Sequence, residues 1–108
     1  MQFDRSKVLV DRKGKEVQEE GKGVLLSTII VNVLDYVNPE HKLAGEDKFQ
    51  RFKLQNKLYL DPEGEVGAET VVSLTSKEVS LILRVLGEAP NISPYVYGQI
   101  KLALGEEE

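Results

Sequence analysis

The fold of this chain is decided by the stretch Val24-Leu25-Leu26-Ser27-Thr28-Ile29-Ile30-Val31-Asn32-Val33-Leu34-Asp35-Tyr36-Val37. Its many β-branched residues favour a strand, but the spacing of its apolar residues favours a helix. Six of them recur at i, i+3, i+4, i+7, i+8 and i+11 and so share one side of a helix: Leu26, Ile29, Ile30, Val33, Leu34 and Val37. We predict a helix over 25–37 that Asn38-Pro39 ends, because the residue before a proline disfavours helical geometry.

A second helix is predicted over 46–60, after a loop that contains Pro39 and Gly45. Two acidic residues, Glu46 and Asp47, suit its first turn because they interact favourably with the helix dipole. The side chains expected to face the core are Phe49, Phe52 and Tyr59, with Leu58 nearby, and the basic residues of the helix are expected to point mostly outward.

Two further helices have clear start signals. Thr75-Ser76-Lys77-Glu78 fits a capping box ahead of a helix over 76–86, and Gly87 is expected to end that helix in the left-handed conformation. Ser93 and Pro94 suit the cap and first position of a helix over 94–104, and Gly98 inside it predicts a close approach of another helix. Residues 105–108 are expected to be a frayed tail. The apolar stripes of these two helices are Val79, Ile82, Leu83 and Leu86, and Val96, Ile100, Ala103 and Leu104.

Short extended segments complete the prediction. Residues 7–18 fit a small hairpin that turns near Gly14, residues 19–23 a polar link, and residues 70–74 an extended segment that could pair with the hairpin as a third strand. The sequence therefore predicts one α+β domain over 1–108, with a small N-terminal β-hairpin, or a three-stranded sheet, packed on about four helices.

The composition excludes several kinds of chemistry. The chain has 108 residues, no cysteine and one histidine. It therefore has no disulfide scaffold, thiol nucleophile, cysteine-ligated zinc site or multi-histidine metal cluster. Fourteen basic and 18 acidic residues give a net charge of −4, which does not favour binding to nucleic acid in general. The charge is uneven, because residues 61–108 carry three basic and nine acidic residues.

No segment reads as a membrane anchor or an export signal. The longest apolar stretch, 24–37, is interrupted by polar residues and is shorter than the roughly 20 residues of a membrane span. The N-terminal sequence lacks the hydrophobic core of a signal peptide. We therefore expect a cytoplasmic protein with no membrane partner.

Motifs for catalysis and cofactor binding are incomplete. His41 has only a neighbouring carboxylate in sequence, and Asp61, Glu63 and Glu65 lack the remaining ligands of a calcium loop. Gly21-Lys22-Gly23 is followed by Val24, where a phosphate-binding loop needs a hydroxyl residue. We expect no enzyme activity, no cofactor and no metal site.

One cluster combines basic and aromatic residues. Phe49 and Phe52 lie among the basic residues Lys48, Arg51, Lys53 and Lys57. Such a pattern suits single-stranded nucleic acid if the rings are exposed, because bases stack on aromatic side chains. The favoured interpretation is that the phenylalanines lie in the core and the basic residues form the solvated face of the helix.

Tyrosines supply the other candidate contact residues. Tyr95 and Tyr97 lie two positions apart and do not share a helix face, so at least one is expected to be exposed. An exposed tyrosine suits a protein interface because a rigid ring carries a polar tip.

The layout of the chain resembles a family of small accessory proteins encoded by tailed bacteriophages and prophages. The resemblance covers most of the chain and is carried by Val8–Lys15, Gly23–Leu34, Gly45–Leu54, Ser73–Ile82 and Gly98–Ile100. The first helix departs from the pattern, because it begins with Gly-Val-Leu where the family would have a threonine cap. The resemblance implies an accessory or assembly protein that acts inside the bacterial cell. It implies no catalytic residue, because the family is largely uncharacterised.

The first functional hypothesis is a non-enzymatic phage protein in the host cytoplasm. It binds a host protein or a phage assembly partner through a surface that includes Lys48, Arg51, Lys53, Lys57, Tyr95 and Tyr97. The alternatives are a nucleic-acid-binding accessory protein that uses the basic face of the second helix, and a structural component of the virion. The sequence leaves homo-oligomerisation open.

Overall fold

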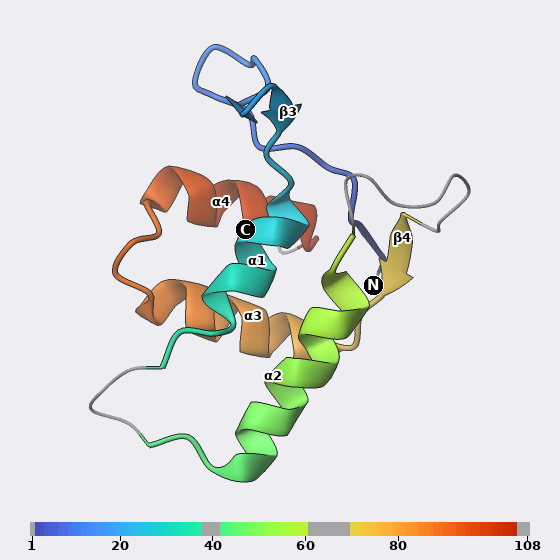
Figure 1. Cartoon of the computed structure of the whole chain (residues 1–108), viewed down its shortest axis with the longest axis vertical. Coiled ribbons are helices and arrows are strands. Elements are labelled where there is room, and N and C mark those ends of the chain that lie inside the picture. The colour runs from blue at the N-terminus through green and yellow to red at the C-terminus, as the bar shows by residue number, and fades with distance from the viewer. Residues whose placement is uncertain (1, 38–41, 61–69, 106–108) are drawn as a thin grey trace.

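The structure, a computed structural model, describes residues 2–37, 42–60 and 70–105. Its helices are α1 (Leu26–Val33), α2 (Gly45–Leu58), α3 (Ser76–Glu88) and α4 (Pro94–Ala103). Helix α1 packs on both α2 and α3, and α4 packs on α3 (Figure 1). Two small antiparallel strand pairs accompany these helices, so the predicted α+β class is confirmed. Within the described ranges, no helix has the length and apolar character that crossing a bilayer requires.

The core forms where the apolar stripes of the four helices meet. Ile30 of α1, Ile82 of α3 and Ile100 of α4 are at most 1% exposed. The other buried apolar residues of the core are Phe3, Leu26, Val33, Leu34, Leu54, Leu58, Leu74, Val79, Val85, Leu86, Ala89 and Leu104. The stripes predicted for α1, α3 and α4 therefore identified much of the core, although Val85 was missed and Leu83 is only partly buried.

Helix α1 is shorter than the predicted span 25–37. It ends at Val33, after which the N–H groups of Asp35 and Tyr36 bond carbonyls three residues back, at Asn32 and Val33. Such i→i+3 bonds tighten the last turn of a helix. The chain then leaves the helix before Asn38-Pro39, and Val37 is 45% exposed. The predicted helix end at residue 37 was therefore wrong by about one turn.

The first strand pair joins distant parts of the chain. Strand β1 (Gln2–Asp4) pairs with β4 (Val71–Ser73), with Phe3 opposite Val72. Phe3 is fully buried, so this pair is anchored to the helical core. The segment predicted at 70–74 is thus extended, but it pairs with β1 and not with the predicted hairpin.

The predicted hairpin over 7–18 is present, and a third segment of the chain pairs with it. Val10 bridges Glu16 around the turn at Gly14, whose φ is +80°. The predicted link over 19–23 is itself a tight hairpin, β2 (Gln18–Glu19) with β3 (Lys22–Gly23). Its two turn residues, Glu20 and Gly21, both have positive φ, which a type I′ turn requires. The N–H of Leu9 donates to the carbonyl of Val24 and its carbonyl accepts from Val17, so residues 22–25 supply the third strand.

Gln99 of α4 holds the paired extended segments of residues 7–25 against that helix. The side chain of Gln99 accepts a hydrogen bond from the N–H of Val10 at 3.1 Å and donates one to its carbonyl at 2.9 Å. The amide group therefore pairs with Val10 as a neighbouring strand would, and it ties two segments 89 residues apart.

The predicted starts of α3 and α4 are confirmed, but two glycine assignments were wrong. Thr75 and Glu78 form the capping box, and Ser93 caps α4 with Pro94 at its first turn. Gly87 does not end α3, which continues to Glu88. Gly98 makes no close approach, because nothing lies within 4 Å of where its Cβ would be. Gly105 does adopt the left-handed conformation, with φ +78°.

Several predictions concern residues outside the described ranges. These are the helix stop at Asn38-Pro39, His41, the carboxylates Asp61, Glu63 and Glu65, and the tail at 106–108.

Candidate binding surface on α2

The aromatic residues of α2 lie on its outer side. Phe49 is 56% exposed, Phe52 53% and Tyr59, just past the end of the helix, 55%. The rings of Phe49 and Phe52 stack with their centroids 6.2 Å apart and an interplanar angle of 23°. We call Phe49, Phe52 and Tyr59, with Lys48 and Lys53, the α2 aromatic face. The prediction that these aromatic side chains face the core was wrong.

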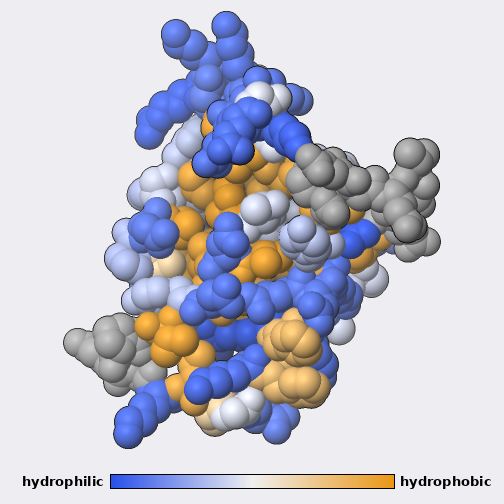
Figure 2. All heavy atoms as spheres, in the orientation of Figure 1, coloured by the Kyte–Doolittle hydropathy of each residue, from blue (hydrophilic) through white to orange (hydrophobic). Residues whose placement is uncertain are grey.

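The rotation of α2 about its own axis explains the difference. The buried residues of α2 are Arg51, Leu54 and Leu58, spaced i, i+3 and i+7. This row and the row of Phe49, Phe52 and Tyr59 lie on different sides of one helix. Two leucines fill the space against α1 and α3, so the larger aromatic rings remain outside. Figure 2 shows light-orange side chains beside α2, bordered by blue ones.

The four basic residues predicted as one cluster have different roles. Lys48 and Lys53 are exposed, and the Lys53 ammonium lies 5.2 Å from the centroid of the Phe49 ring, a cation–π distance. Lys57 is engaged with α3, and Arg51 is buried at 6% exposure. Only Lys48 and Lys53 therefore belong to the same exposed surface as the phenylalanines.

Arg51 holds the end of α1. Its guanidinium donates to the carbonyl of Tyr36 at 2.6 Å and to that of Leu34 at 3.3 Å. These carbonyls follow the last turn of α1, where backbone acceptors lack partners within the helix. Burial lowers the pKa of Arg51, and the nearby Arg84 lowers it further. Arg51 is thus a structural residue, and its assignment to a partner surface was wrong.

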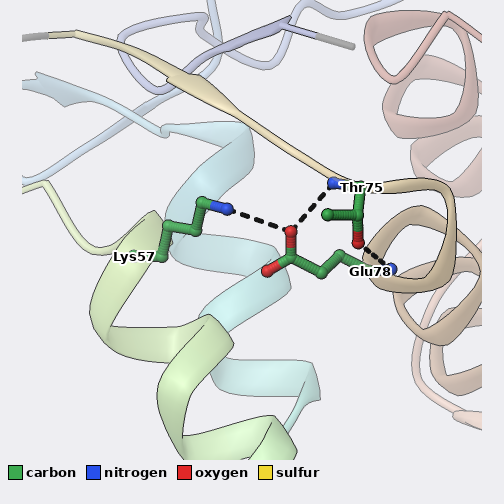
Figure 3. Close-up of polar contacts among 3 residues, drawn as sticks. All are labelled: Lys57, Thr75 and Glu78. Carbon is green, nitrogen blue, oxygen red and sulfur yellow. Dashed lines mark hydrogen bonds and ion pairs between the residues drawn. The ribbon is translucent and has the colours of Figure 1, made fainter.

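Lys57 links α2 to the start of α3 (Figure 3). Its ammonium lies 2.9 Å from Oε1 of Glu78, the same oxygen that accepts the N–H of Thr75 at 2.9 Å. Burial alone would raise the pKa of Glu78, but the hydrogen bonds from Thr75 and Lys57 outweigh it and lower that pKa. The carboxylate therefore stays ionised, closing the capping box and pairing with α2.

The tyrosines of α4 belong to a different part of the molecule. Tyr95 and Tyr97 are both partly buried, so the prediction that at least one of them is exposed was wrong. Tyr97 packs against the core, and the Arg12 guanidinium lies 5.0 Å from the centroid of the Tyr95 ring. Helix α4 packs on α3, and Figure 1 shows it at the upper left with α2 at the lower right. The six predicted contact residues therefore do not form one surface.

A groove adjoins the α2 aromatic face. It lies between α2 and α3, is open to solvent and has a volume of about 1040 Å³. Lys53 and Lys57 line it from α2, and Lys77 and Arg84 line it from α3. The sequence analysis did not predict this groove, because it forms between two helices. Their contacting residues, Lys57 and Glu78, are 21 positions apart in sequence.

The charge of the described ranges differs from that of the whole chain. All 14 basic residues lie in these ranges, but eight of the 18 acidic residues lie outside them, so the formal charge there is +4 and not −4. The acidic character predicted for residues 61–108 therefore comes from segments other than α3 and α4. An anionic partner is thus compatible with the described surface.

The structure adds nothing to the weak motifs for metal or phosphate binding. Within the described ranges, no three acidic or histidine side chains gather closely enough to hold a metal ion. Gly21-Lys22-Gly23 belongs to the β2–β3 hairpin and does not lead directly into a helix, since α1 begins at Leu26.

Comparisons with known proteins returned no match, whether against family models, curated proteins or solved structures.

Proposed function

We propose that this protein is a non-enzymatic module that binds another protein through the α2 aromatic face. The observation that carries the proposal is the exposed stack of Phe49 and Phe52, more than half accessible to solvent. In line with the sequence resemblance, the proposal includes a phage or prophage origin, a host or phage protein as the partner, and action in the host cytoplasm.

The physical argument concerns exposed aromatic surface. Full burial of a phenylalanine side chain contributes about 1.5 to 3 kcal/mol, so two half-exposed rings leave about that much unrealised in the free protein. A partner that covers both rings would gain this free energy. Aromatic residues also dominate binding at the centres of protein interfaces.

The spacing on α2 suits recognition of a helix by a groove. Phe49, Phe52 and Tyr59 occur at i, i+3 and i+10, so they follow one side of the helix. A helix that presents such a row inserts its side chains into an apolar groove of its partner. Lys48 and Lys53 border the row and favour a partner with acidic residues around that groove.

Binding to single-stranded nucleic acid is the second candidate function. It is favoured by the exposure of Phe49 and Phe52 and by the charge of +4 on the described ranges. However, Arg51 is buried and Lys57 is paired with Glu78, so two of the four basic residues that this function required are engaged within the fold. Protein binding is therefore the better supported function.

Recovery of a partner with matched variants tests the proposal. The immobilised protein is exposed to lysate of the bacterium that carries its gene, and each recovered protein is purified for titration calorimetry. The double variant Phe49→Ser/Phe52→Ser should bind that partner at least about tenfold more weakly, as expected for two central aromatic contacts.

Leu102→Ser supplies the control. Leu102 is 65% exposed on α4, so its replacement removes an exposed apolar side chain away from α2. We expect it to leave the affinity within about twofold. Equal affinities of the wild type and the Phe49→Ser/Phe52→Ser variant for every recovered partner would overturn the proposal.

A further inference from the structure

The groove between α2 and α3 has an apolar floor. Leu54 of α2 is 2% exposed, and Leu81 of α3 is partly buried against the core. Both line the groove, Leu81 with Lys77 four positions before it and Arg84 three positions after it, and Leu54 with Lys57 three positions after it. Side chains at this spacing lie on the same side of a helix. The groove thus combines an apolar floor with positively charged edges.

The basic residues outnumber the acidic ones in the groove. Four of the lining residues are basic, namely Lys53, Lys57, Lys77 and Arg84, and two are acidic, Asp47 and Glu78. Lys57 and Glu78 neutralise each other. The side chains of Lys77 and Arg84 make no hydrogen bond or ion pair with any residue of the described ranges. Among the described residues, nothing therefore competes with a ligand for these two cations on α3.

Lys53 connects the groove with the α2 aromatic face. Its side chain lines the groove, and its ammonium lies over the ring of Phe49. A bound chain that covers Phe49 and Phe52 therefore reaches the groove by crossing α2 at this lysine. The two features form one continuous surface.

We propose that this groove binds an acidic, amphipathic segment of the partner protein, with carboxylates near Lys53, Lys77 and Arg84 and apolar side chains over Leu81. The proposal rests on the proposed function, because the same partner covers the α2 aromatic face. The bound segment carries apolar side chains on one side and acidic residues beside them.

The groove itself favours a peptide over a nucleic acid. An apolar floor suits leucine-like side chains, whereas a phosphate backbone would leave the floor uncovered. Asp47 lies in the groove and carries no hydrogen bond to another described residue, so it repels a continuous line of phosphates. A peptide avoids this repulsion by placing a neutral residue there.

A pair of synthetic peptides tests this inference in the whole 108-residue chain. The acidic probe is an amphipathic helical peptide of about 16 residues with leucines on one side and glutamates on the flanks, and its neutral twin has glutamine at every glutamate. Binding is followed by amide chemical shifts of the ¹⁵N-labelled protein, which also detects weak complexes. The acidic probe should bind about tenfold more tightly, with its largest shifts at residues 50–57 and 76–84.

Charge-reversal variants locate the carboxylates. Lys77→Glu/Arg84→Glu should weaken binding of the acidic probe about tenfold and leave the neutral twin unchanged. Lys13→Glu/Lys15→Glu changes the net charge equally on the exposed turn after Asp11 and should leave both affinities within about twofold. The shift map of the wild type needs no variant and remains informative if one of them folds poorly.

The outcomes separate this inference from the proposed function. If both peptides bind equally and Phe49→Ser/Phe52→Ser weakens both, the aromatic face binds protein but the groove does not select acidic segments. If the acidic probe does not bind, the inference is overturned. The proposed function is then tested separately, by partner recovery. If a poly-dT oligonucleotide binds the groove more tightly than the acidic probe, the ligand is nucleic acid and the inference is wrong.

Discussion

Replacing Arg51 by methionine isolates the hydrogen bonds that hold the end of α1. Methionine keeps an unbranched side chain between the helices but removes the guanidinium, which donates to the carbonyls of Tyr36 and Leu34. Hydrogen bonds from a charged donor contribute about 1.5 to 3 kcal/mol each, and the 3.3 Å bond to Leu34 belongs at the weak end. Removing a buried charge recovers part of this, because burial disfavours the charged form. We expect a net loss of about 2 kcal/mol in the free energy of unfolding.

Urea unfolding followed by circular dichroism measures this loss. For a domain of this size, about 2 kcal/mol corresponds to a decrease of roughly 10 °C in Tm. Lys53→Met is the matched control, since it makes the same chemical change at an exposed residue two positions away, and it should alter the stability by less than about 0.5 kcal/mol. If the two variants are equally stable, the hydrogen bonds of Arg51 do not hold the end of α1.

Three further predictions concern local features. Gly98→Ala should raise the free energy of unfolding by about 0.5 to 1 kcal/mol in urea, because the position is helical and a Cβ there meets nothing within 4 Å. A loss of stability would instead reveal a close packing contact. Gln99→Ala leaves the N–H and carbonyl of Val10 without the side-chain partner, so amide exchange across residues 16–25 should accelerate more than in α3, whereas uniform acceleration would contradict this clamp. The lowered pKa of Glu78 means that its ionised form stabilises the fold above the ordinary glutamate pKa of about 4.3 and loses this effect as the pH falls through the lower folded-state pKa. The stability difference between wild type and Glu78→Gln should therefore shrink at acid pH, and a difference independent of pH would contradict the assignment.

The sequence predicted the helices whose apolar residues form a single stripe. In α1, α3 and α4 one side is apolar and the other polar, so spacing alone identified most buried residues. Capping residues then located the starts of α3 and α4, because Thr75, Ser93 and Pro94 act through neighbours within three residues.

Helix α2 shows why the candidate surface was less predictable. It carries two apolar rows, one with Leu54 and Leu58 and one with Phe49 and Phe52, and hydrophobicity alone favoured the aromatic one. The choice depends on the space left by α1 and α3, which is a property of the assembled core. The roles of Arg51 and Lys57 likewise depend on partners 15 and 21 residues away in sequence.

The end of α1 illustrates a further limit of pattern reading. The apolar stripe continues to Val37, but Arg51 and Gln55 of α2 supply donors to the carbonyls of Tyr36, Leu34 and Val31. Side chains from another helix thus satisfy the backbone where α1 stops. The sequence of residues 24–37 contains no indication of these two side chains from α2.

The proposed function requires that the exposed rings of Phe49 and Phe52 serve binding and not folding. The most direct test is the dissociation constant of the recovered partner for the Phe49→Ser/Phe52→Ser variant relative to Leu102→Ser. We expect at least about a tenfold difference between these two variants. Equal dissociation constants would contradict it, because the α2 aromatic face would then have no part in the interface.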